Sequence, residues 1–172
     1  MKNLSIKFLA ASFSLLSLMG CQKDDICPES TQTTPLLVLR FYDAQERDNA
    51  QAPINLSVRE INNDTTWLYR VNRDSIVIPL RTDADQTQYE FILNDQESDT
   101  IPDQSIETNT DLLTFSYARE QEYINRACSF KINYLDLKLQ VDGEEDGEWI
   151  QDIFIEQTEV TDEASAHISL YY

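Results

Sequence analysis

The side chains that could carry out chemistry in this sequence are few. His167 is the single histidine, and the cysteines are Cys21, Cys27 and Cys128. Nucleophilic catalysis needs a hydroxyl or thiol with a base in hydrogen-bond reach, and usually an acid that orients the base. The chain contains no G-x-S-x-G motif, and one histidine without a C-x-x-C pair does not make a zinc ligand set. We therefore expect a protein that is not an enzyme and that holds no metal and no cofactor.

Carboxylates are abundant, with 31 Asp and Glu residues against 13 Lys and Arg and a formal net charge of −18. This acidity excludes nucleic acid as a partner, because phosphate binding needs a basic surface. Paired carboxylates can hydrolyse glycosidic bonds, but in so acidic a chain pairs arise by chance. The segment DGEEDGE at 142–148 offers oxygen ligands but lacks the order of an EF-hand loop. We expect a solvated turn there, with a calcium site as the alternative.

The N-terminus has the pattern of a secretory signal peptide. Lys2 and Lys7 make residues 1–7 basic, residues 8–19 are uncharged and mostly apolar, and the small residue Gly20 follows. This order is typical of a signal peptide, and the apolar run is shorter than the roughly 20 residues that a membrane-spanning helix needs. We expect residues 1–20 to be removed.

Leu18, Met19, Gly20 and Cys21 together resemble the lipobox of bacterial lipoproteins. The resemblance implies that the sulfur of Cys21 takes a diacylglyceryl group and that the chain is cut just before it, which leaves residues 21–172. Met19 departs from the small or β-branched residue that is usual at its position. One acyl chain binds a membrane only weakly, whereas two or more hold it firmly. Cys21 is therefore expected to anchor the protein to a membrane.

If Cys21 is acylated, Cys27 and Cys128 are left as a pair in an oxidising compartment, where disulfides persist. We predict that they are bonded; the alternative is two unconnected cysteines, one in a tail and one buried. Cys128 is in phase with Phe130 and Ile132, so it should point inward. The bond would then fix the end of the lipidated N-terminus and polar tether, residues 21–35, against a core strand.

From Leu36 onward, alternation of apolar and polar residues dominates, which is the pattern of β-strands, and residues 36–42 are apolar enough to be covered on both sides. Pro79 indicates an edge strand or a bulge. A change of phase near Tyr134 and Leu135 indicates a β-bulge or a strand that passes between sheets. Strands are expected over residues 36–42, 54–60, 65–71, 75–80, 87–93, 112–118, 128–141, 149–160 and 164–172. The stretch 149–160 should be the hairpin partner of 128–141.

The same alternation assigns faces to the remaining candidate residues. His167 is out of phase with Ile168 and Leu170 on the last strand, so it should face outward or lie near a rim. Trp67 and Trp149 could form a sugar-stacking or protein-binding patch. Aromatic residues of sheets are more often core or cross-strand pairs, so we expect both tryptophans in the core.

No helical periodicity follows the signal peptide. Short strands separated by turn signals favour a single antiparallel β-sandwich of immunoglobulin-like type, with about seven to nine strands, over residues 36–172. A small closed β-barrel is the alternative.

Four stretches together resemble an uncharacterised family, a domain of unknown function in small Bacteroidota-type outer-membrane lipoproteins with an all-β domain. They are residues 21–43, 73–91, 128–134 and 163–172. The resemblance implies a lipid anchor and supports the pairing of Cys27 with Cys128. It brings no activity and no catalytic residue.

A second resemblance concerns the residues just after Cys21. Gln22, Lys23, Asp24 and Asp25 resemble the surface-export signal of lipoproteins in such bacteria, a lysine with acids next to the acylated cysteine. The resemblance implies a protein on the outer leaflet of the outer membrane that faces the medium. A protein that faces the periplasm is the alternative.

We therefore expect a lipid-anchored cell-envelope lipoprotein that acts as a non-enzymatic binding or structural module at the outer-membrane surface. Acylated Cys21 makes the membrane one partner, and a protein or glycan of unknown identity is the other. The alternative is a carbohydrate-handling accessory protein or hydrolase whose site is assembled from dispersed carboxylates and aromatics. A deep cleft lined by acids and a tryptophan would favour that alternative.

Overall fold

The computed structural model describes residues 26–61, 66–96, 106–143 and 147–172. Among these residues all regular secondary structure is β-strand, and no helix is long and apolar enough to span a bilayer. The strands are β1 Leu37–Tyr42, β2 Leu56–Glu60, β3 Thr66–Val71, β4 Ser75–Ile78, β5 Gln86–Leu93, β6 Asn109–Asn125, β7 Ser129–Gly143, β8 Asp152–Ile155 and β9 Ile168–Tyr171. The described residues divide into two units, one of Gln32–Tyr123 with Phe130–Tyr172 and one that includes residues 26–31 and Ile124–Ser129.

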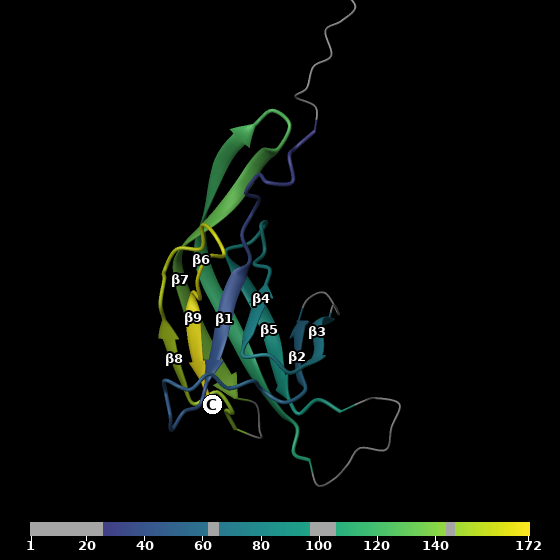
Figure 1. The fold of residues 1–172 in the computed structure, drawn as a ribbon, viewed down its shortest axis with the longest axis vertical. Coiled ribbons are helices and arrows are strands. Elements are labelled where there is room, and N and C mark those ends of the chain that lie inside the picture. The colour runs from purple at the N-terminus through teal and green to yellow at the C-terminus, as the bar shows by residue number, and fades with distance from the viewer. Residues whose placement is uncertain (1–25, 62–65, 97–105, 144–146) are drawn as a thin grey trace, which may run out of the picture. The chain divides into compact units, whose positions relative to one another are not determined.

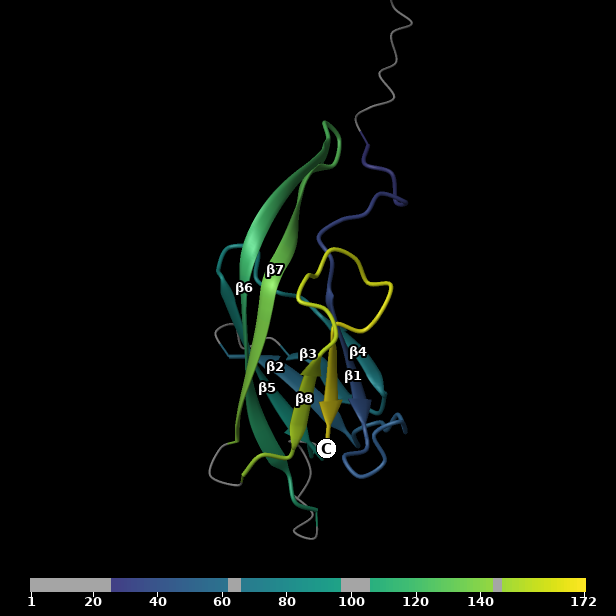
Figure 2. The ribbon, with the colours of Figure 1, turned by 90° about the vertical axis from the view of Figure 1, so that its left-hand side faces the viewer.

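The larger unit is a β-sandwich of two sheets (Figures 1 and 2). One sheet has the strand order β4-β1-β9-β8, and the other has the order β3-β2-β5-β6-β7. The predicted sandwich is thus confirmed. The closed-barrel alternative is wrong, because each sheet ends in two edge strands. The prediction from Pro79 is also confirmed, since β4 is an edge strand and ends at Ile78, one residue before the proline.

One strand pair departs from the antiparallel expectation. β9 lies parallel to β1, with Leu39 opposite Ile168 and Phe41 opposite Leu170. Hairpin connections force neighbouring strands to be antiparallel, but β1 and β9 are the first and last strands and share no such connection. The sheet is therefore mixed, and β9 is covered on both edges by β1 and β8.

The predicted hairpin between 128–141 and 149–160 does not form, although Val160 makes one antiparallel bridge with Tyr134 of β7. β8 pairs with β9 in the four-stranded sheet, whereas β7 belongs to the five-stranded sheet. The segment between them therefore crosses from one sheet to the other. Trp149 and Ile150 are both buried at this crossing, and Asp111 of β6 accepts hydrogen bonds from both of their backbone N–H groups. Two consecutive buried residues do not fit a hairpin strand with one solvent face.

The core lies between the two sheets. On β1, Leu37, Leu39 and Phe41 are each 0% exposed, and on β6 so are Leu113 and Phe115. Burying a side chain of this size contributes about 1.5–3 kcal/mol relative to leaving it in water. These alternating apolar residues explain why both segments fold as strands, as the sequence pattern predicts.

The predicted bulge in β7 is confirmed. Tyr134 exchanges backbone hydrogen bonds with Val160, whereas the N–H of Leu137 donates to the carbonyl of Thr158. Three steps along β7 therefore match two steps along the facing segment, which is the count of a β-bulge. Asp136 takes up the extra residue in a left-handed conformation, with φ of 54°. The bulge lets Tyr134 and Leu137 both point into the core.

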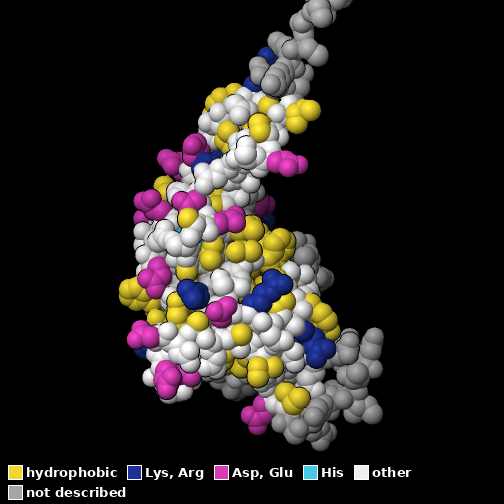
Figure 3. Space-filling model, viewed as in Figure 1, with side chains coloured by type: hydrophobic (Ala, Val, Ile, Leu, Met, Phe, Trp, Pro, Cys, Tyr) yellow, Lys and Arg dark blue, Asp and Glu magenta, His cyan; other side chains and the backbone are white. Residues whose placement is uncertain are grey.

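The surface reflects the acidic composition. Asp and Glu side chains are scattered over the face seen in Figure 3, where they are interspersed with hydrophobic surface and with several Lys and Arg side chains. Charge dispersed in this way keeps an acidic protein soluble without creating one strongly attractive patch.

Candidate functional site

A pocket of about 600 Å³ lies where the chain leaves β4 and turns towards β5. Glu60 at the end of β2 and Tyr89 of β5 complete its wall. Its lining consists of Glu60, Pro79, Leu80, Arg81, Thr82, Asp83 and Tyr89. The β4–β5 connection, which passes from one sheet to the other, therefore supplies most of the surface that a ligand would meet.

Tyrosine hydroxyl groups hold this connection in place. Three of them donate to the carbonyls of three consecutive residues: Tyr89 to Pro79 at 2.7 Å, Tyr134 to Leu80 at 2.9 Å and Tyr117 to Arg81 at 3.0 Å. The tyrosines come from β5, β7 and β6 of the five-stranded sheet. Carbonyls that have left the ladder of β4 need partners once they are buried. The facing sheet supplies these partners through its side chains.

The acidity of these hydroxyl groups fits a donor role. Burial raises the pKa of Tyr134 to about 12, and burial also raises the pKa values of Tyr89 and Tyr117. Nearby Glu60 raises the pKa of Tyr89 further. All three phenols therefore keep their protons at neutral pH and donate to the backbone. They act as fixed donors of the framework.

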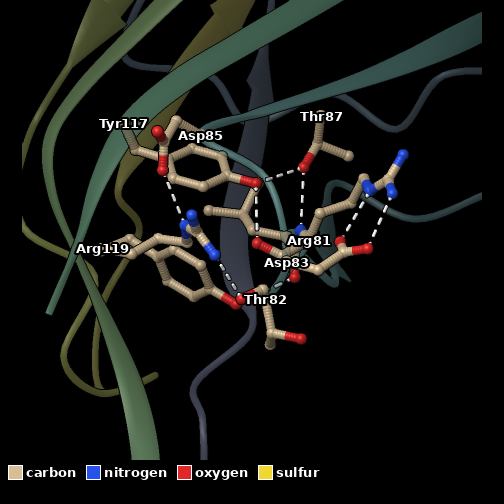
Figure 4. Close-up of polar contacts among 9 residues, drawn as sticks. Arg81, Thr82, Asp83, Asp85, Thr87, Tyr117 and Arg119 are labelled. Atoms are coloured by element: carbon tan, nitrogen blue, oxygen red, sulfur yellow. Dashed lines mark hydrogen bonds and ion pairs between the residues drawn. The ribbon is translucent and has the colours of Figure 1, made fainter. Parts of the chain in front are cut away.

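Thr87 extends this network within the buried part of the molecule. Its hydroxyl oxygen accepts a hydrogen bond from the backbone N–H of Arg81 at 2.9 Å and lies 2.6 Å from the hydroxyl oxygen of Tyr117 (Figure 4). Because Tyr117 gives its proton to the carbonyl of Arg81, the proton between the two hydroxyls belongs to Thr87. Both backbone polar groups of Arg81 are thereby satisfied.

Ion pairs order the rim of the pocket. Arg81 binds Asp83 through two hydrogen bonds of 3.0 Å, and Arg119 of β6 binds Asp85 at 2.7 Å (Figure 4). Arg119 also donates to the carbonyl of Thr82 at 2.7 Å. The Arg81 guanidinium lowers the pKa of the Asp83 carboxyl. The rim thus presents a guanidinium and a carboxylate side by side, an arrangement suited to binding a polar group.

Several predicted site residues fall beyond the described part of the chain. The lipidation site Cys21 and the export-signal residues Gln22, Lys23, Asp24 and Asp25 all lie outside the described residues. They stay predictions from the sequence.

The predicted disulfide is present. Cys27 and Cys128 are bonded, with 4.7 Å between their Cα atoms and a sequence separation of 101. The predicted position of Cys128 on a core strand is wrong, because it lies half-buried in the turn between β6 and β7. The side-chain oxygen of Asn125 accepts hydrogen bonds from the N–H groups of Ala127 and Cys128 and so closes this turn.

The prediction that His167 faces outward or lies near a rim is wrong, because the residue is 1% exposed. Its backbone N–H donates to the carbonyl of Val38 at 2.9 Å, and its side-chain Nδ1 accepts from the N–H of Val38 at 3.0 Å. The alternation of apolar and polar residues does not predict this burial. The imidazole hydrogen-bonds to the backbone of β1, as the backbone of a neighbouring strand would. Burial lowers the pKa of His167, so the ring is neutral at neutral pH and its Nδ1 is available as an acceptor.

The two tryptophans differ in position. Trp149 is in the core, as predicted, and stacks on Phe41 with 6.3 Å between ring centroids. Trp67 is 43% exposed, so its predicted core position is wrong. Its indole N–H donates to the carbonyl of Val77 at 2.9 Å. Trp67 thus links β3 to β4, the edge strands of the two sheets.

The acidic segment 142–148 is described only in part, because residues 144–146 lie outside the described ranges. Within those ranges, no group of three or more His, Cys, Asp or Glu side chains is placed to hold a metal ion. Asp111 is a polar residue that sequence reasoning missed: it is 0% exposed and binds backbone N–H groups. Its position opposite Phe91 in the β5–β6 register is visible only once the strands are paired.

These features define a small all-β protein with a two-sheet sandwich and a polar pocket at a sheet crossing. A family model described as a family of unknown function (DUF6452) matches residues 55–172. The match covers more than half of the chain, and the chain belongs to this family. It includes the pocket and Cys128 but not Cys27. No curated protein and no solved structure matches the chain.

Proposed function

We propose that this protein is a lipid-anchored lipoprotein of the bacterial cell envelope, of Bacteroidota type, and a non-enzymatic binding or structural module at the outer-membrane surface. The observation that carries the proposal is the disulfide between Cys27 and Cys128. Disulfides persist in oxidising compartments and are rare in the cytosol. The bond therefore supports export, and the lipobox-like residues before Cys21 supply the route and the anchor.

The polar groups in and around the pocket support a binding role rather than catalysis. Tyr117, Thr87, Arg81 and Arg119 are all engaged in hydrogen bonds or ion pairs that fix the β4–β5 connection. A general base or nucleophile has to be free to exchange its proton during the reaction. A rigid pocket of paired charges is better suited to holding a polar ligand or a partner's side chain.

The anchor is tested by expressing the full chain in a Gram-negative host and measuring the mass of the purified protein. We expect cleavage before Cys21 and an added mass of at least two acyl chains, with the protein in the membrane fraction. The matched control is Cys21→Ala, which should carry no acyl chain and leave the membrane fraction. A wild-type protein with a free Cys21 thiol would refute the proposal.

The surface position is tested separately by digesting intact cells with protease. We expect the wild-type protein to be degraded. Replacing Lys23, Asp24 and Asp25 together by alanine should protect it while leaving Cys21 acylated, because the export signal is removed and the lipobox is not. If the wild-type protein is protected until the cells are lysed, the protein faces the periplasm, which is the alternative expected from the sequence.

The carbohydrate-handling alternative has weaker support. The lining of the pocket includes the acids Glu60 and Asp83 but neither tryptophan. Trp149 is buried in the core and Trp67 lies at the β3–β4 edge. Sugar sites commonly use an exposed aromatic ring as a stacking surface. Calorimetric titration with soluble oligosaccharides tests this alternative, and binding that is lost in Arg81→Ala would favour it.

A further inference from the structure

The β6–β7 hairpin carries an exposed aromatic pair. β6 pairs with β5 only as far as Ser116, and the residues from Ala118 to Tyr123 are exposed. Tyr123 of β6 and Phe130 of β7 are 58% and 51% exposed, and their rings meet edge to face with 5.1 Å between centroids. Two large aromatic side chains in contact form a larger apolar patch than isolated surface residues do.

One ion pair of this hairpin belongs to the other face. Neighbouring residues of a strand point to opposite faces, so Glu122 and Lys131 lie opposite Tyr123 and Phe130. Glu122 pairs with Lys131 at 3.2 Å and accepts a hydrogen bond from Asn133 at 2.8 Å. The face that carries the aromatic pair is therefore free of this ion pair and is suited to a less polar environment.

The local charge of the hairpin differs from that of the whole chain. Residues 118–133 contain three cationic side chains (Arg119, Arg126 and Lys131) and two acidic ones (Glu120 and Glu122), in a chain whose formal net charge is −18. A segment with a slight positive charge can approach an anionic lipid surface, whereas a strongly acidic one is repelled. The hairpin is thus electrostatically suited to contact a membrane.

The covalent structure fixes how far this hairpin can be from the anchor. Cys27 is bonded to Cys128, which precedes Phe130 by two residues. Cys21 and Cys27 are six residue steps apart, a distance of at most roughly 20 Å when fully extended. A second contact also joins the N-terminal segment to this hairpin, because Thr34 accepts a hydrogen bond from the N–H of Ile132 on β7. An acylated Cys21 therefore keeps the bilayer within reach of the hairpin.

We propose that Tyr123 and Phe130 rest on the bilayer that holds the acyl chains of Cys21. This inference depends on the proposed lipid anchor. Aromatic side chains are enriched at the membrane–water interface, where a ring contacts the apolar boundary and a tyrosine hydroxyl reaches the headgroups. The pair thus provides a second point of contact, and it sets which side of the hairpin faces the lipid.

The test uses the lipidated full-length protein in vesicles of phosphatidylethanolamine and phosphatidylglycerol, with and without brominated acyl chains that quench tryptophan. Phe130→Trp reports on the hairpin. Phe154→Trp is the matched control, because Phe154 is similarly exposed, at 57%, on β8. The wild-type signal from Trp67 and Trp149 is subtracted from both. We expect brominated lipid to lower the Phe130→Trp emission by at least about two-fold, as for a side chain at the acyl boundary, and to leave Phe154→Trp unchanged.

The outcomes separate this inference from the anchor itself. If both variants float with the vesicles but are quenched equally, the anchor stands and the membrane contact of the hairpin is refuted. If neither variant floats, the anchor fails and the contact fails with it. A blue-shifted Phe130→Trp emission before vesicles are added, together with a dimer in sedimentation, would place a second copy on the pair and overturn the bilayer as its occupant.

Discussion

Tyr89, Tyr117 and Tyr134 show how single hydroxyl groups join the two sheets. The aromatic ring of each tyrosine is buried in the core. The hydroxyl group of each donates a hydrogen bond to a backbone carbonyl of the β4–β5 connection. Tyr117 and Tyr134 also pack edge to face, with 4.9 Å between ring centroids. The residues that build the core on one side therefore also fix the floor of the pocket on the other.

Removing one of these donors is expected to be costly. Tyr134→Phe keeps the ring but leaves the carbonyl of Leu80 without its partner, which should lower the free energy of unfolding by about 1–3 kcal/mol. Urea unfolding measures the loss. The control is Tyr69→Phe, since Tyr69 is 55% exposed, and its stability should stay close to that of the wild type. Equal stability of both variants would show that the Leu80 carbonyl gains nothing from the hydroxyl.

His167 makes the stability depend on pH. Burial lowers its folded pKa below the ordinary value of 6.5, and this effect outweighs the opposite influence of Asp162 and Glu163. Below pH 6.5 the unfolded chain binds a proton that the folded chain does not. The free energy of unfolding should therefore fall as the pH falls from 6.5 towards the folded pKa, and be unaffected by this group above 6.5.

His167→Asn should reduce that dependence, because it removes the titrating group from both states. Urea unfolding at pH 7.5 and pH 5.5 compares the two proteins. The wild type should lose more stability than the variant between the two values, and the remaining loss in the variant measures the contribution of carboxylates. Identical losses would mean that the imidazole titrates alike in both states.

At the scale of elements, the sequence predicts where strands form better than which strands pair. Alternation identified β5 and β6 because each has one face in the core, the apolar run 36–42 identified β1, and Pro79 identified the end of β4. Pairing depends on residues far apart in the chain. No local sequence pattern indicates that β1 pairs in parallel with β9. For the separation of β8 from β7, the one local indication is the pair of adjacent buried residues Trp149 and Ile150.

The edge between β3 and β4 offers a test at this scale. Trp67→Phe retains an aromatic ring but removes the N–H that donates to Val77. We expect a loss of about 1 kcal/mol in unfolding free energy and, because the edge of β4 loses its cover, more light scattering on storage. Tyr69→Phe on the same strand serves as the control. If Trp67→Phe scatters no more light than Tyr69→Phe, the indole does not protect the edge.

At the scale of the whole molecule, the pocket could not be predicted from the sequence. Its residues come from β2, from the β4–β5 connection and from β5, and only the crossing between the sheets brings them together. The disulfide was predictable because Cys21 resembles an acylation site and leaves two cysteines. Its place in the β6–β7 turn was not, since Ser129 adopts a left-handed conformation with φ of 63° that interrupts the alternation on which that assignment depended.

The disulfide should contribute substantially to stability. In the chain-entropy model, cross-linking a loop of about 100 residues is worth up to about 4.7 kcal/mol. In a mature chain with Cys21→Ser, replacing Cys27 and Cys128 by serine should lower the free energy of unfolding towards that limit, as measured in urea. The parent with its disulfide reduced serves as a second comparison and should match the double variant. No difference between parent and double variant would show that the cross-link does not constrain the unfolded chain.

The cross-link also determines how mechanical load would enter an anchored protein. Tension on the N-terminus passes from Cys27 to Cys128 and into the turn between β6 and β7. Residues 28–36 are bypassed, so β1, a central strand of its sheet, is not peeled from its neighbours while the bond holds. Reduction would reroute the force through Leu37 and pull on that strand directly. The bond thus protects the first strand of the fold from tension that is applied at the membrane.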